Sequence, residues 1–196
     1  MAISLTKGGN VNLSKEAGPA GLNKLTIGLG WNVRRTSGDA YDLDAFAVLV
    51  DANGRVLDGS EKNLIFFNNK QDASGAITHG GDNRTGEGEG DDETIDVELG
   101  RVPTSAQKIV VFVTIHDGQK KGQNFGQVEN AYVRAVNAEG GTELARFDLS
   151  EDASTVTTMI FGELYRAGTE WKFRAVGDGF QAGIEALLQS YGLAVG

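Results

Sequence analysis

The sequence predicts an all-β protein: a two-sheet β-sandwich with short helical turns and one C-terminal helix. Apolar residues alternate with polar or small residues in several segments, for example residues 25–31 and 94–99, and this period of two is typical of strands with one buried face. The chain also has 28 glycines and only 2 prolines, which suits many turns between short strands. Many closely spaced strands with few helices between them favour a sandwich.

The individual strands follow from the local patterns. Besides the two alternating segments, residues 41–50 and 108–115 are nearly continuous apolar runs, as expected for strands buried on both faces. Residues 131–136 alternate again. Turn-forming sequences at residues 51–54, 137–141 and 166–169 separate predicted strands.

Helical structure is predicted in three places. Residues 103–106 and 124–128 have the composition of single helical turns. Near the C-terminus, the apolar residues recur at helical spacing, and a glycine follows as a stop signal; they are Phe180, Ile184, Leu187, Leu188 and Tyr191, followed by Gly192. No linker or change of composition divides the chain, so we expect one domain over residues 1–196.

Composition limits the function. The 196 residues carry 27 acidic and 18 basic side chains, a net charge of −9, which argues against a general nucleic-acid binder because phosphate binding needs a basic face. No apolar run approaches the length that spans a bilayer, so no direct membrane insertion is expected. The absence of cysteine excludes disulfides, thiolate metal sites and a cysteine nucleophile. With no apolar segment in residues 1–18, we expect a cytoplasmic protein.

The most unusual segment is acidic and rich in glycine. Residues 78–99 contain eight acidic residues and one basic residue, Arg84. Because predicted strands lie on both sides, the segment is an inter-strand loop of more than a dozen residues, a length typical of functional or disordered connections. Residues 82–93 have the length of an EF-hand loop, but Arg84 at position three, glycine at position five and the absence of flanking helices exclude that motif.

The loop nevertheless has the chemistry of a calcium site. Calcium takes six to eight oxygen ligands from carboxylates, amides and backbone carbonyls, and glycines let a loop turn its carbonyls inward. The loop supplies carboxylates from Asp82, Glu87, Asp91, Asp92 and Glu93, and an amide oxygen from Asn83. The alternative is an acidic hairpin tip that is simply solvated.

A second pair of carboxylates opens the apolar run at residues 41–50. At a period of two, Asp42 and Asp44 share a face with Phe46, where unpaired carboxylates are costly. The nearest basic residues in sequence are Arg34 and Arg35, so we expect no Lys or Arg to accompany the pair and a cation to serve as its counter-charge. Alternatively, both aspartates lie exposed at the strand opening, bonded to backbone amides. Two further amides, Asn68 and Asn69, end another strand.

At this point a family resemblance becomes specific. The segments GLGW, DLDA, FFNN, GDNRTGEGEGDDE, TIHD, NFGQV, DLSEDASTVTTMIFGELYR and EWKFRAVGDGF occur in this order along nearly the whole chain. Together they resemble the TerD family of calcium-binding proteins of tellurium resistance and stress response. The resemblance implies a β-sandwich whose loops at one end bind about two calcium ions, and a role through other proteins of the stress-response system.

The resemblance also implies the metal ligands. They are the carboxylates of the DLDA segment, the amides of the FFNN segment and the acidic loop, including a glycine with an available carbonyl: Asp42, Asp44, Asn68, Asn69, Asp82, Asn83, Gly86, Glu87, Asp91, Asp92 and Glu93. One position departs from the family. Asn32 follows Trp31 where the family usually has aspartate, so we leave Asn32 out of the ligand set.

Two other functions stay open. A metal-dependent hydrolase or phosphatase would need a base or nucleophile near the ions, and His79 lies close to the loop in sequence, while His116 and Asp117 follow a buried strand. The second alternative function is a sensor that binds a small ligand, such as a nucleotide, through a metal ion. Because no serine-nucleophile or nucleotide-binding motif is present, we expect a protein that is not an enzyme. Trp31 and Trp171 are predicted to lie in the core.

Overall fold

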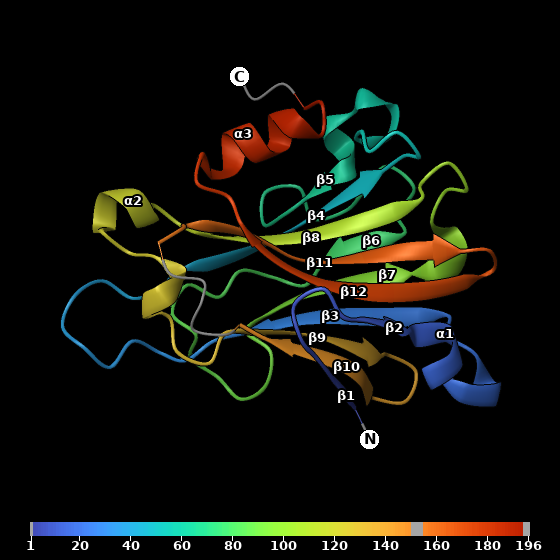
Figure 1. Ribbon diagram of the computed structural model, residues 1–196, viewed down its shortest axis with the longest axis horizontal. Helices are drawn as coiled ribbons and strands as arrows, with labels where there is room; N and C mark the ends of the chain where they lie inside the picture. The colour runs from blue at the N-terminus through green and yellow to red at the C-terminus, as the bar shows by residue number, and fades with distance from the viewer. Residues whose placement is uncertain (1, 150–154, 194–196) are drawn as a thin grey trace.

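The structure is a computed structural model that describes residues 2–149 and 155–193, so residues 150–154 of the quoted DLSEDASTVTTMIFGELYR segment lie outside it. The strands within these two ranges form two six-stranded sheets that lie face to face (Figure 1). The predicted all-β sandwich is confirmed.

The first sheet has β3 and β9 at its centre. In spatial order it contains β1 (Ile3–Leu5), β10 (Thr142–Asp148), β9 (Tyr132–Asn137), β3 (Lys24–Gly30), β7 (Glu93–Glu98) and β6 (Ile77–His79). The second sheet contains β2 (Asn10–Asn12), β12 (Glu170–Gly179), β11 (Thr158–Ala167), β8 (Lys108–Ile115), β4 (Leu43–Val50) and β5 (Leu64–Ile65). The β1–β10 pair is parallel, and the other named pairs are antiparallel.

Helices are short and lie outside the sandwich. They are α1 (Leu13–Glu16), α2 (Gly118–Lys121) and α3 (Gly183–Ser190), together with 3-10 turns at Gly18–Ala20, Leu57–Gly59, Glu61–Asn63, Leu99–Arg101 and Phe125–Gln127. The C-terminal helix and the helical turn predicted within residues 124–128 are therefore confirmed. Residues 103–106 form a turn closed by a hydrogen bond from the Ala106 N–H to the Pro103 carbonyl oxygen, 3.0 Å. In the described ranges no helix has both the length and the apolar character that crossing a membrane requires.

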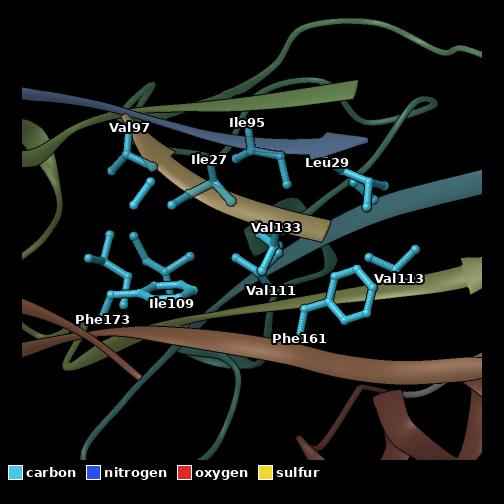
Figure 2. Close-up of a cluster of buried hydrophobic side chains, with 14 of the residues drawn as sticks. Ile27, Leu29, Ile95, Val97, Ile109, Val111, Val113, Val133, Phe161 and Phe173 are labelled. Carbon is cyan, nitrogen blue, oxygen red and sulfur yellow. The ribbon is translucent and has the colours of Figure 1, made fainter. Parts of the chain in front are cut away.

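The main core fills the space between the sheets. Figure 2 shows Ile27, Ile95 and Val133 of the first sheet facing side chains of the second, such as Val111 and Phe161. These side chains are almost fully buried, and each lies on the inward side of an alternating or continuous apolar strand. Trp31 and Trp171 also belong to this core, as predicted.

A second apolar cluster covers the outer face of the second sheet. Leu187 and Leu188 of α3 pack there with Phe46 of β4 and Phe112 of β8, and Figure 1 shows α3 above this sheet. Strand β4 is therefore covered on both sides: Leu43, Ala45, Ala47 and Leu49 belong to the inner core, and Phe46, Val48 and Val50 to the outer cluster. This explains its continuous apolar sequence.

Candidate metal centre

Three aspartates from distant parts of the sequence meet where β4 begins. Asp42 immediately precedes β4, Asp44 is its second residue, and Asp82 belongs to the loop between β6 and β7. One carboxylate oxygen from each lies within 4.8 Å of the others. The segment that precedes β4 and the α2 turn that follows β8 lie at the same end of the sandwich, on the left in Figure 1. The two acidic segments predicted from the sequence thus form one cluster.

Two of the three carboxylates are buried. Asp42 is 6% exposed and Asp44 is 4% exposed, so the alternative that both lie exposed at the strand opening is wrong. Burial, together with the negative charges of Glu93, Asp42 and Asp82, raises the pKa of Asp44 to about 8. The cluster is short of positive charge.

Asp42 carries the clearest sign of a missing partner. Its Oδ1 atom is buried and has no hydrogen-bond partner among the described residues, which is costly for a carboxylate oxygen. Its Oδ2 atom lies 3.6 Å from Nε of Arg84. The expectation that no Lys or Arg accompanies the pair is therefore wrong. Arg84 is far from Asp42 in sequence and reaches it because the loop folds back over β4.

Arg84 neutralises the cluster only partly. Its side chain is 73% exposed, so water screens its attraction for the carboxylates. It lowers the pKa of Asp44, but more weakly than burial and the neighbouring carboxylates raise it.

Glu93 anchors the acidic loop to β4. It is the first residue of β7, and its side chain is fully buried. Its Oε2 accepts a hydrogen bond from the Ala45 N–H at 2.7 Å, and its Oε1 accepts one from the Asn83 N–H at 3.2 Å. Burial raises its pKa. Nε2 of the equally buried His79 lies 3.5 Å from Oε2.

Asn83 organises the loop. Its side-chain oxygen accepts hydrogen bonds from the N–H groups of Thr85 and Gly86, both at 3.1 Å. Its side-chain nitrogen donates to Oδ1 of Asp92 at 3.0 Å and to the carbonyl oxygen of Glu87 at 3.1 Å. The amide therefore holds both ends of the acidic segment together, a role that the sequence-based ligand assignment did not include.

Asp92 and Gly86 fix the loop to Trp31. Oδ2 of Asp92 accepts a hydrogen bond from the Trp31 N–H at 2.9 Å, and burial together with the charge of Asp91 raises the pKa of Asp92. Gly86 has φ = +72°, and a Cβ atom there would lie 2.6 Å from the indole nitrogen of Trp31. Only glycine combines this backbone conformation with this close approach.

Asp91 is held by a different network. The guanidinium of Arg134 donates to its Oδ1 at 2.7 Å and to its Oδ2 at 3.0 Å, and the hydroxyl of Tyr132 donates to Oδ1 at 3.0 Å. The carboxylate lies over Gly28 of β3, where a Cβ atom would overlap it, and the Tyr132 ring lies over Gly30 in the same way. Asp91 therefore clamps the end of the loop onto the first sheet.

Three further predicted ligands are Glu87, Asn68 and Asn69. Glu87 is exposed in the loop, and Asn68 is exposed in the connection between β5 and β6. The side-chain nitrogen of Asn69 donates to the carbonyl oxygen of Leu64 at 2.6 Å. Asn69 shares a cavity with Asp44.

His116 is the neighbour that sequence reasoning left out of the site. Its backbone N–H donates to the carbonyl oxygen of Asp42 at 2.8 Å, and its Nδ1 lies 3.5 Å from Oδ2 of Asp44. The sequence shows only that His116 directly follows the apolar run at residues 108–115. The structure adds that β8 is paired with β4 and that Ile115 lies opposite Leu43, which brings His116 beside the aspartates.

These groups suit a hard cation. Buried carboxylates with an unsatisfied oxygen, next to a loop rich in carbonyl and carboxylate oxygens, are the ligands that calcium prefers. A divalent cation would supply the positive charge that the cluster lacks and would keep the Asp44 carboxylate ionised.

The fold and site together define a class: β-sandwich proteins with an acidic loop cluster at one end. The sequence matches the TerD domain family over residues 1–191. It is 53% identical over 193 residues to the "Tellurium resistance protein TerD" of Serratia marcescens, with 98% of each chain covered. It is 48% identical to "General stress protein 16U" of Bacillus subtilis, with both chains fully covered. The chain therefore belongs to the TerD family, as the resemblance implied.

Solved structures agree with the fold. A homologue of telluride resistance protein (TerD) from Streptomyces coelicolor A3(2) is similar with a TM-score of 0.66 and 26% identity, covering 82% of this chain and 92% of that one. A protein of unknown function, SAV2460, gives a TM-score of 0.71 at 24% identity, with 89% of this chain and 99% of that one covered. The second likeness concerns the fold alone.

Proposed function

We propose that the protein binds calcium at the cluster of Asp42, Asp44 and Asp82 and acts through protein partners in tellurium resistance or a general stress response. The observation that carries the proposal is the buried Oδ1 of Asp42, which has no hydrogen-bond partner among the described residues and lies in a cluster of three carboxylates. Membership of the family, with relatives named for tellurium resistance and general stress, supports the physiological setting.

About two ions are proposed. The first occupies the three-aspartate cluster. The second takes oxygens from the acidic loop, where the Glu87 carboxylate and the Gly86 carbonyl belong to a turn already ordered by Asn83. Calcium is favoured over magnesium because these oxygens are numerous and include carboxylates that can bind through both oxygens, whereas magnesium requires compact octahedral geometry.

A binding role is proposed in preference to catalysis. His79, the candidate base nearest the loop in sequence, has a side chain with no exposed surface and faces Glu93, so it is shielded from substrate. The test is turnover of a generic phosphoester by the calcium-loaded protein. Turnover that disappears in Asp82→Asn would establish the hydrolase instead.

Calorimetric titration with calcium tests the binding site. We expect Asp42→Asn to weaken the affinity of the first site at least tenfold, because it removes the charge on the carboxylate that carries the unpartnered oxygen. Asp58→Asn is the matched control: it removes the same charge at an exposed position with φ = 56°, which asparagine tolerates. Unchanged calcium affinity in Asp42→Asn would refute the assignment.

The partner proposal needs a separate measurement. Tagged wild-type protein and Asp42→Asn are compared in pull-downs from stressed cells, with calcium and with a chelator. We expect partners that are retained by the wild type only in calcium and lost in the variant. An identical set of partners in all four conditions would show that partner binding does not depend on calcium at the cluster.

A further inference from the structure

The outer face of the second sheet carries a large cavity that shares only Asp44 and Asn69 with the predicted calcium ligands. Its volume is about 700 Å³, and it lies between α3 and the connection that contains Phe66 and Phe67. Phe46 of β4, Leu188 of α3 and Asp44 also line it. This volume is within the range of sites that hold small organic ligands.

Three phenylalanine rings, Phe46, Phe66 and Phe67, line the cavity beside aliphatic side chains. The rings of Phe46 and Phe66 are stacked with centroids 5.4 Å apart and an angle of 14° between their planes. Phe46 is stacked in turn on Phe112 at 5.0 Å and 8°, and Phe67 meets Phe66 edge-on at 5.4 Å and 80°. Phe66 and Phe67 are only half-buried. A planar ring in the cavity would remove their remaining apolar surface from water.

The charged lining is predominantly negative. Glu61, Asp117 and Glu185 line the cavity, against Lys62 and the imidazole of His116. Asp117 is paired with Lys120 at 2.9 Å, which leaves two exposed carboxylates, Glu61 and Glu185, beside the aromatic rings. This arrangement attracts cations and repels anions, and the faces of aromatic rings attract cations as well.

We propose that this cavity binds an organic cation built on one or two fused aromatic rings. The ring system lies against Phe46, Phe66 and Phe67, and the ammonium group faces Glu61 and Glu185. The proposal goes beyond the calcium function: the cavity borders the calcium cluster at Asp44, but neither the aromatic rings nor these two glutamates belong to the proposed calcium ligands.

The test uses two probes with the same ring and opposite charge, 1-naphthylmethylammonium and 1-naphthoate. Both are titrated into the full chain by NMR or calorimetry in a chelator, so the result does not depend on calcium. We expect saturable, one-to-one binding of the ammonium probe and at least tenfold weaker binding of naphthoate. Equal affinity for the two probes, or no saturable binding of either, would overturn the proposal.

Variants separate the two parts of the site. Replacing both glutamates, Glu61→Gln with Glu185→Gln, should weaken the binding of the ammonium probe several-fold and reduce the difference in affinity between the two probes. Phe67→Ala should weaken the binding of both probes. If Phe67→Ala does not fold, the same measurement is made on Phe67→Leu, which removes the aromatic ring but keeps most of the side-chain volume. Ammonium binding that is unaffected by the double glutamine variant would show that charge does not select the ligand.

Two control variants lie outside the cavity. Phe180→Ala truncates a half-buried ring that packs against the same outer cluster but is not part of the cavity lining. Glu16→Gln removes an exposed carboxylate in α1, at a distance from α3 (Figure 1). Both should bind the ammonium probe like the wild type. A loss in either control equal to that of the cavity variants would overturn the placement of the site.

Discussion

Replacing Asp44 by asparagine should stabilise the metal-free protein at neutral pH while weakening its binding of calcium. In the unfolded chain the Asp44 carboxyl has an ordinary pKa of 3.8, whereas burial and the neighbouring carboxylates raise the pKa to about 8 in the folded protein. The raised pKa means that the folded state binds a proton that the unfolded state releases. Ionisation of Asp44 therefore does not lower the stability of the folded state below pH 4. The free energy of unfolding falls as the pH rises from about 4 to about 8.

The magnitude follows from the same two pKa values. A pH of 7 lies roughly three units above the pKa of Asp44 in the unfolded chain and below its pKa in the folded protein. Each unit of difference between the pH and the unfolded-state pKa corresponds to about 1.36 kcal/mol. Asp44 thus lowers the stability of the metal-free protein at pH 7 by about 4 kcal/mol. An uncharged asparagine of the same shape removes this effect.

Urea unfolding in a chelator at several values between pH 4 and pH 8 measures the effect. The gain in Asp44→Asn over the wild type should be near zero at pH 4 and should grow to a few kcal/mol at pH 7. The control Asp58→Asn should show no such trend. A variant that is equally or less stable than the wild type at every pH would refute the reasoning, because the buried carboxyl would then not be disfavoured in its ionised form.

Three further predictions follow from the site and its supports. Calcium at about 100 times its dissociation constant should raise the free energy of unfolding by roughly 2.7 kcal/mol per site; identical thermal melts in chelator and in calcium would contradict this. Calcium binding heats should persist in a large excess of magnesium, and their disappearance would reduce the site to a generic acidic surface. Gly28→Ala should displace Asp91 from Arg134 and lower the free energy of unfolding by about 1–3 kcal/mol. The control Gly100→Ala, where a Cβ atom has no neighbour within 4 Å, should have little effect. Equal losses of stability in the two variants, measured by urea unfolding, would show that the pairing of Asp91 with Arg134 over Gly28 is unimportant.

The sequence was sufficient to predict the sandwich because local patterns and final environment agree. The apolar run of β4 reads as a strand buried on both faces, and in the structure Leu43 and Leu49 belong to the inner core while Phe46 and Val48 belong to the outer cluster. The C-terminal helix was predictable for the same reason: its apolar residues at helical spacing form one face, which packs on the second sheet.

The partners of the acidic residues were less predictable. Asp91 and Arg134 are 43 positions apart, and Arg84 reaches Asp42 only because of the way the loop folds. Composition identifies a loop crowded with carboxylates, but it does not say which carboxylates already have a partner. The structure divides them: Asp91 is paired with Arg134, Glu93 bonds to backbone amides, and Asp42 keeps an oxygen without a partner among the described residues.

The support of the acidic loop by Gly28, Gly30, Trp31 and Glu93 has a thermodynamic consequence. Much of the entropy cost of ordering this loop is met when the chain folds, because its two ends are attached to both sheets by contacts that require no ion. An ion that arrives afterwards finds its ligands preorganised and has to fix only the turn between them. The cation would then act as a ligand of an already folded protein, unlike zinc in a zinc finger, where metal binding and folding are one event.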